Sequence, residues 1–283
     1  MGYTFVKSED KRFIGCIAAI FVIIIGGYAG LVFSTGLNSP FSVIMSESMQ
    51  HDEHHSQIGI IDTGDVVIVK NKDKSEIQSY IEGTVSGYST FGDYGSVIIY
   101  NRDSTSNPVI HRAILWLDYD PSTDTWSAPS LEDYQGSWYW EYMGVKHTTT
   151  TGIKGILHFD DLTQSHKHPS INLDALRSED KKSGYLTMGD NVNNYLFDQG
   201  TSIISHPIDM DDIRSIPFME IPWIGTIKLL FKNESKLQCV TNSLPSLVMM
   251  FVTIISLFII IDLFGTMYDK SKHVIRRNRF RKI

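Results

Sequence analysis

The chain has 283 residues, a length that suffices for one or two domains with a hydrophobic core. It carries 32 Asp and Glu against 25 Lys and Arg, and its net charge of -7 argues against general binding of nucleic acid. Its two cysteines, Cys16 and Cys239, are too few for a disulfide scaffold, and nothing in the chain has the spacing of a zinc site.

The first predicted element is a membrane span at residues 13–33, after a polar N-terminus at residues 1–12. These 21 residues contain no charged side chain. At a rise of about 1.5 Å per residue, a helix of this length crosses a hydrocarbon core of about 30 Å. A cleaved signal peptide is the alternative, but its apolar core usually has only about 7–15 residues. We therefore expect an uncleaved anchor.

A second apolar run predicts another span at residues 244–264. Its one charged residue, Asp262, lies close to the end, where a carboxylate reaches the interface at little cost. The tail at residues 265–283 follows, and the last fourteen residues of the chain carry seven Lys and Arg. By the positive-inside rule both termini are expected in the cytoplasm, with residues 34–243 outside it or in a lumen.

Residues 34–243 are predicted to form a mostly β domain. Short β-branched or apolar runs alternate with Gly, Asp and Asn, and convincing amphipathic helices are scarce. The predicted strands are Phe41–Met45, Val66–Val69, Val97–Tyr100, Val109–Leu115, Gly155–Phe159 and Ile203–Ile204. Residues 116–184 are rich in Trp, Tyr, Ser, Thr and Asp, which indicates an inserted small β subdomain. Its aromatic residues are interpreted as a minor core, with a ligand platform as the alternative.

Two histidine-rich segments raise the question of a metal. His166-Lys167-His168 lacks other obvious ligands, and His51-Asp52-Glu53-His54-His55 is interpreted as an exposed polar linker. We therefore expect neither a metal nor a cofactor.

Four segments of the predicted β domain stand out by their polar residues. In chain order they are Ser46–Met49, Thr63–Val69, Val109–Ile114 with His111 and Arg112, and Thr187–Asn191 followed by Asp198-Gln199-Gly200. Alone, each has an ordinary interpretation, such as a Gly-Asp turn or a structural histidine in a strand. Together they supply a serine hydroxyl, a histidine that can take its proton and carboxylates that can orient the histidine. Nucleophilic catalysis of acyl transfer requires these parts.

In this order, and after an N-terminal anchor, the four segments resemble type I signal peptidase of the archaeal and endoplasmic-reticulum subtype. The resemblance covers residues of about 40–115 and 184–230. Ser46–Met49 matches the family's Ser-Gly-Ser-Met motif, and Gly64–Val67 matches its Gly-Asp-Ile/Val-Val strand. Ile110–Arg112 matches its strand with a basic residue. Gly189–Asn191 matches its Gly-Asp-Asn motif, and Asp198–Gly200 matches the Asp-x-Gly that follows it. Residues 221–225 also resemble the short apolar motif that closes the family's catalytic domain.

The resemblance implies a serine endopeptidase that cleaves signal peptides from exported preproteins. Ser48 would be the nucleophile and His111 the general base. Bacterial members have Lys at the position of His111, and a lysine needs its pKa depressed, whereas the ordinary pKa of histidine is already about 6.5. Asp198 is the expected third member of the triad, with Asp190 as the alternative.

Further roles follow from the same resemblance. The Ser48 backbone N–H and the Ser46 hydroxyl would stabilise the oxyanion. Ile44, Met49 and Ile110 would line a shallow apolar pocket for small side chains before the cut. The expected partners are signal peptides of preproteins, membrane lipid and, as a further candidate, the protein translocation machinery.

The chain departs from the family's pattern in three ways. Glu47 stands between the serines in place of a small residue, His51 replaces a proline, and the spacing from Asp190 to Asp198 is a residue or two longer. Two alternatives therefore stay open: a catalytically inactive signal-peptidase-like subunit, and a membrane-anchored binding protein that uses residues 116–184. The expected location is an archaeal plasma membrane, with the endoplasmic reticulum as the alternative, and Asn233 begins a glycosylation sequon.

Overall fold

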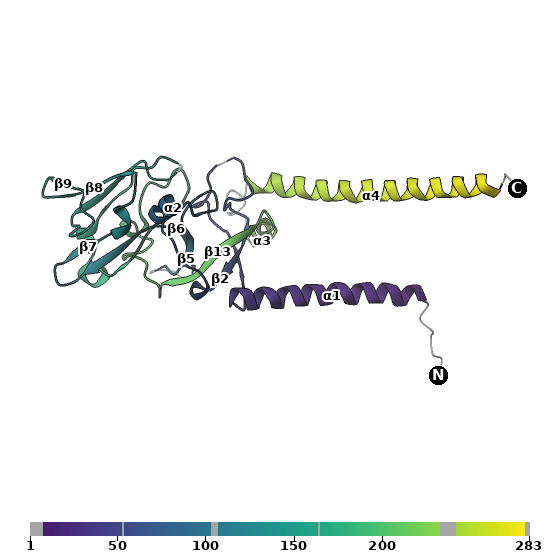
Figure 1. Cartoon of the computed structure of the whole chain (residues 1–283), viewed down its shortest axis with the longest axis horizontal. Coiled ribbons are helices and arrows are strands. Elements are labelled where there is room, and N and C mark those ends of the chain that lie inside the picture. Colours follow the sequence, from purple (N-terminus) through teal and green to yellow (C-terminus); the bar gives the residue numbers. More distant parts are fainter. Residues whose placement is uncertain (1–7, 53, 103–106, 164, 233–241, 281–283) are drawn as a thin grey trace, which may run out of the picture.

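The computed structural model describes residues 8–52, 54–102, 107–163, 165–232 and 242–280, and for residues 8–13 and 269–280 it describes the backbone alone. Two long helices leave the same end of a mostly β body (Figure 1). The sequon at Asn233 and the second cysteine, Cys239, lie outside the described residues.

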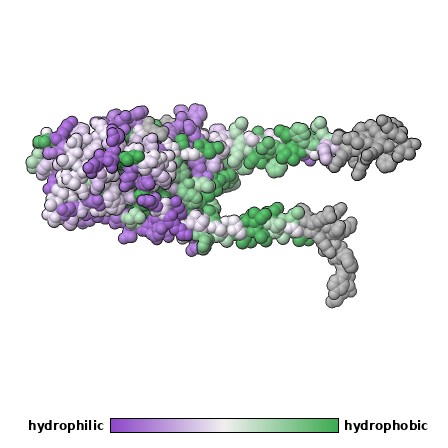
Figure 2. Space-filling view, viewed as in Figure 1, coloured by the Kyte–Doolittle hydropathy of each residue, from purple (hydrophilic) through white to green (hydrophobic). Residues whose placement is uncertain are grey.

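Helices α1, Ser8–Thr35, and α4, Ser243–Phe280, correspond to the two predicted spans. Within them, residues 14–35 and 243–268 are long and apolar enough to cross a membrane. Their side chains are almost all exposed, and Figure 2 shows an apolar surface along both helices next to a polar body. Exposed apolar side chains over such lengths are typical of helices that face lipid.

Both helices are fastened to the body beside strand β2, Val66–Lys70. Lys74 Nζ donates hydrogen bonds to the carbonyl oxygens of Phe33 and Ser34, which belong to the last turn of α1 and lack partners within the helix. At the first turn of α4, the hydroxyl of Ser243 donates to the carbonyl of Thr63. The two spans therefore attach near opposite ends of β2, α1 beside Lys74 after the strand and α4 beside Thr63 in the turn before it.

The main sheet is antiparallel and has the strand order β1-β2-β13-β5-β6-β12, with β7 paired to β6. Besides β2, its strands are β1 Phe41–Val43, β5 Val97–Tyr100, β6 Val109–Asp120, β7 Thr125–Ser127, β12 Gly184–Met188 and β13 Ile213–Ile221. A two-stranded hairpin, β3 Ser89–Thr90 and β4 Asp93–Tyr94, stands apart.

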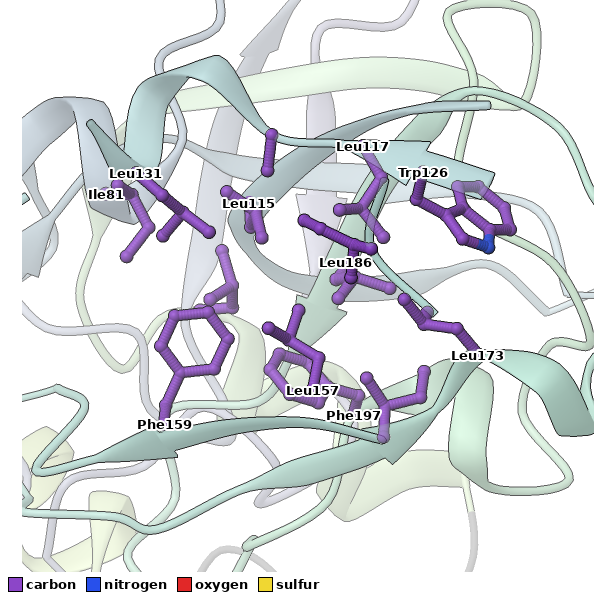
Figure 3. Packing of buried hydrophobic residues seen from close by; sticks show 14 of the residues in the cluster. Ile81, Leu115, Leu117, Trp126, Leu131, Leu157, Phe159, Leu173, Leu186 and Phe197 are labelled. Atoms are coloured by element: carbon purple, nitrogen blue, oxygen red, sulfur yellow. The ribbon is translucent and has the colours of Figure 1, made fainter. Parts of the chain in front are cut away.

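Residues 116–184 contain a separate four-stranded sheet in the order β11-β10-β8-β9. Its strands are β8 Ser137–Tyr142, β9 Val145–His147, β10 Ile156–Asp160 and β11 Ser170–Asn172. Its buried side chains join those of β6 and β12 in one core (Figure 3). Trp126, Trp140 and Phe159 lie in this core, so these aromatic residues serve packing.

Short helical segments complete the body. They are α2 Tyr80–Ser86, α3 Gly225–Lys232 and the 3-10 turns η1 Lys72–Lys74, η2 Pro129–Leu131, η3 Leu173–Ala175, η4 Ser178–Asp180 and η5 Asp198–Gly200. The prediction of a strand at Ile203–Ile204 was wrong. This pair lies in a loop after η5, where burial of Ile204 at 2% exposure, rather than strand pairing, accounts for its apolar character.

Candidate active site

The side chain of His111, from strand β6, contacts the side chain of Asp198, from the 3-10 turn η5. His111 Nδ1 lies 2.7 Å from Asp198 Oδ2, and both side chains are buried. The same Oδ2 accepts hydrogen bonds from the hydroxyls of Tyr100 and Thr187, each at 2.6 Å. A carboxylate oxygen with these donors accepts from Nδ1–H of the imidazole, and in a neutral ring the other nitrogen, Nε2, is then a proton acceptor.

Asp190, the alternative triad member, faces a different partner. Arg112 Nε donates to its Oδ1 at 2.9 Å, and Arg112 Nη1 donates to the carbonyl oxygens of residues 90, 93, 94 and 95. Burial favours a higher pKa for Asp190, but the charge and hydrogen bonds of Arg112, together with His51, outweigh it and hold the pKa well below its usual range. The structure thus brings Asp198 rather than Asp190 to His111.

Strand geometry explains this division. His111 and Arg112 are consecutive residues of β6, so their side chains point to opposite faces of the sheet. His111 reaches η5, which carries Asp198, and Arg112 reaches the loop after β12, which carries Asp190. The two carboxylates are therefore held apart by the pleat of one strand.

Ser48 lies in the turn after β1 and lines the same cavity as His111. The volume of this cavity is about 360 Å³. Ser48 Oγ is 3.3 Å from Ser46 Oγ, and in the described residues it makes no hydrogen bond to His111. Gly189 lies beside both groups, since a Cβ atom on Gly189 would be 3.0 Å from His111 Nε2 and 2.3 Å from the Ser48 carbonyl oxygen.

The loop of Gly189, Asp190 and Asn191 forms hydrogen bonds to the backbone of the turn that carries Ser48. The Asn191 amide N–H donates to the Ser48 carbonyl at 3.0 Å, and Asn191 Nδ2 donates to the Glu47 carbonyl at 2.7 Å. The Gly-Asp turn contributes too, because Gly64 N–H donates to the carbonyl of Ile44. The Glu47 side chain is exposed and does not line the cavity, so a carboxylate at this position leaves the cavity open.

The expected oxyanion and substrate groups lie around the same cavity, with one exception. Ser46, Ile44 and Ile110 line it. The Ser48 backbone N–H has no hydrogen-bond partner among the described residues. Met49 is 1% exposed and packs in a core cluster instead of lining the cavity.

The histidine-rich segments do not form a metal centre in the part of the chain that the structure describes, where no group of three or more His, Cys, Asp and Glu side chains could hold an ion. The expectation of an exposed linker is wrong for His51, which is half-buried and lies with Nε2 3.4 Å from Asp190 Oδ2. His166 pairs with Asp161 on the surface.

Sequence reasoning assigned no role to three residues around the site: Tyr100, Thr187 and Lys167. Tyr100 and Thr187 hydrogen-bond to Asp198, and the buried Lys167 donates to the carbonyl of Gly189. Their only signals were a tyrosine ending an apolar strand, a threonine beside the Gly-Asp-Asn motif, and a lysine between two histidines.

No protein-family model matches the chain, and no curated protein matches it.

Proposed function

We propose that this chain is a membrane-bound serine endopeptidase of the type I signal peptidase kind, which removes N-terminal signal peptides from exported preproteins. The observation that carries the proposal is the 2.7 Å contact between His111 Nδ1 and Asp198 Oδ2, behind a cavity that Ser48 also lines. The motif resemblance and the two apolar helices support it.

In the proposed mechanism, His111 Nε2 takes the proton from Ser48 Oγ as the oxygen attacks the scissile carbonyl. The imidazolium then gives this proton to the leaving amine, and water hydrolyses the acyl-enzyme. Asp198 fixes the tautomer and stabilises the imidazolium. Ser48 Oγ must turn from Ser46 toward Nε2, a contact that in many enzymes forms only when substrate binds.

The substrate would bind along β1. Among the described strands β1 pairs with β2 alone, so its other edge can accept an extended peptide by main-chain hydrogen bonds. Ile44 and Ile110 would face the small side chains that precede the cut. The free Ser48 N–H and the Ser46 hydroxyl would receive the oxyanion.

The proposed topology has both termini in the cytoplasm and the catalytic body outside it. Both helices leave one end of the body, as a two-pass protein with one external domain requires (Figure 1). The positive charge at the ends of both spans that point away from the body supports this orientation. The proposed membrane is that of an archaeal cell or, alternatively, the endoplasmic reticulum. There the protein would meet preproteins as the translocation machinery delivers them.

The second candidate is an inactive signal-peptidase-like subunit. The observation that favours it is the hydrogen-bond partner of Ser48 Oγ, which is Ser46 rather than His111. In this candidate the same groove would hold peptides without cutting them.

The deciding experiment is cleavage of a preprotein, with an Ala-x-Ala signal-peptide end, by the full chain in liposomes. Ser48→Ala and His111→Ala should each lower kcat by about 10³-fold or more, because each removes a member of the triad. Ser137→Ala and His158→Ala, which lie on the small sheet, are matched controls and should keep full activity.

Equal cleavage by S48A and the unaltered chain would overturn the proposal. Absence of cleavage by the unaltered chain, with binding of the same preprotein retained, would favour the inactive subunit.

A further inference from the structure

A hairpin of the small sheet reaches the back of the candidate site. Its tip, between β10 and β11, is closed by two backbone hydrogen bonds between Leu162 and Lys167, of 2.7 and 2.8 Å. Thr163 N–H donates to the hydroxyl of Tyr80 in α2 at 3.1 Å, and Lys167 Nζ donates to the carbonyl of Gly189 at 2.9 Å. The tip is therefore fixed to the main body at two separate points.

Lys167 is fully buried, with 0% exposure. Lysine is rarely buried without a partner, because removing an ammonium group from water is costly. Burial, with a smaller contribution from Arg112 of β6, lowers the pKa of Lys167 to about 8, while the carboxylates of Asp190 after β12 and Asp93 of β4 favour its charged form. Among the described residues, the single hydrogen bond of its ammonium group is the one to Gly189.

The accepting carbonyl belongs to a residue that lies beside both His111 and Ser48. Gly189 lies against His111 Nε2 and the Ser48 carbonyl, and two residues later Asn191 holds the Ser48 and Glu47 carbonyls. A displacement of the 189–191 loop therefore moves the serine turn relative to the imidazole.

We propose that Lys167 is a positioning residue of the active site, which holds the 189–191 loop through the Gly189 carbonyl and so sets the placement of Ser48 against His111. The inference rests on the proposed function. It assigns a task to the inserted sheet, which is to support the catalytic loop from behind.

The test compares Lys167→Met with Lys146→Met in the full chain in liposomes. Methionine keeps an unbranched side chain at position 167 but removes the donor, and Lys146 is an exposed lysine of the same small sheet. We expect K167M to lower kcat by about 10- to 100-fold, since small misplacements of reacting groups have effects of this size. KM should change by less than about threefold, because the cavity lining is untouched, and K146M should match the unaltered chain.

A further variant separates positioning from general anchoring of the hairpin. Tyr80→Phe removes the contact to Thr163 and leaves Lys167 in place, so kcat should stay within about twofold. A loss in Y80F equal to that in K167M, or a rise in KM of K167M with kcat unchanged, would overturn the proposal. Should K167M not fold, Lys167→Leu, which also lacks a donor, takes its place and the same split between kcat and KM is required.

Hydrogen exchange supplies a readout that does not depend on cleavage. In K167M the amide of Asn191 should exchange faster than in K146M, because its hydrogen bond to Ser48 is no longer supported. If the unaltered chain cleaves no preprotein, the proposed function fails, and exchange alone decides whether Lys167 holds the loop. Unchanged exchange at residues 189–191 counts against the positioning role in either case.

Discussion

At the scale of single residues, the site separates two buried carboxylates by function. Asp198 accepts hydrogen bonds from the hydroxyls of Tyr100 and Thr187 and from the imidazole of His111, an arrangement that orients the imidazole. Asp190 neutralises a fully buried guanidinium, which suits stability. Removing one member of a buried ion pair typically costs about 3–5 kcal/mol, because the other charge is left without compensation.

Asparagine at position 198 should therefore reduce activity with little loss of stability, and asparagine at position 190 should mainly reduce stability. Asp198→Asn should lower kcat by about 10³- to 10⁴-fold through loss of the imidazole tautomer, with a small change in Tm. Asp190→Asn should lower the free energy of unfolding by about 3 kcal/mol, while molecules that remain folded keep more of their kcat. Thermal melting and preprotein cleavage on the same preparations measure both. An equal, mild effect from the two substitutions would contradict the assignment of Asp198.

At the scale of elements, the segment between β1 and β2 is held against the end of β13 by the buried Asp65 and the half-buried Glu220. Asp65 accepts hydrogen bonds from the backbone N–H groups of Asp62 and Trp223, at 2.7 and 2.8 Å. Glu220 of β13 accepts from the N–H of Gly59. Burial raises the pKa of Asp65 and of Glu220 to about 7 in each case, above their ordinary values of 3.8 and 4.5.

These shifts predict a stability that falls as the pH rises. Between about pH 4 and pH 7 the folded chain binds more protons than the unfolded chain, so deprotonation favours unfolding across this window. Glu220→Gln cannot lose a proton, and its Tm should decline less between pH 5 and pH 8, by an amount worth about 1–2 kcal/mol after screening by solvent. Glu76→Gln, at an exposed position, is the control. Parallel pH profiles for E220Q and the unaltered chain would show that Glu220 does not titrate in this window.

The elements also show which parts of the fold can be predicted from the sequence and which cannot. The continuous apolar run Val97–Tyr100 forms strand β5. Both faces of this strand are buried, and each face therefore needs apolar side chains. Helix α2 has only seven residues, too few for a periodic signal, although the capping box of Ser79 and Glu82 marks its start. Which carboxylate meets His111 depends on the direction of side chains from β6, and residue types and spacing alone do not fix that direction.

At the scale of the whole molecule, the inserted residues are not a separate folding unit. Leu157 and Phe159 of β10 lie in the same cluster as Leu115 of β6 and Leu186 of β12 (Figure 3). A core shared by two sheets couples their stability, because loss of either sheet exposes the apolar face of the other. The support that Lys167 gives to the catalytic loop depends on this coupling.

The coupling predicts a single unfolding transition for the β body. Leu157→Ala removes a side chain that is 0% exposed and should cost about 2–5 kcal/mol. Because the core is shared, amides of β12 and of β10 should lose the same amount of protection, which hydrogen exchange measures strand by strand. Val145→Ala, at an exposed position of β9, should leave both unchanged. Loss of protection in β10 with β12 unaffected would mean that the small sheet opens by itself, and Lys167 would then lack the rigid base from which it holds Gly189.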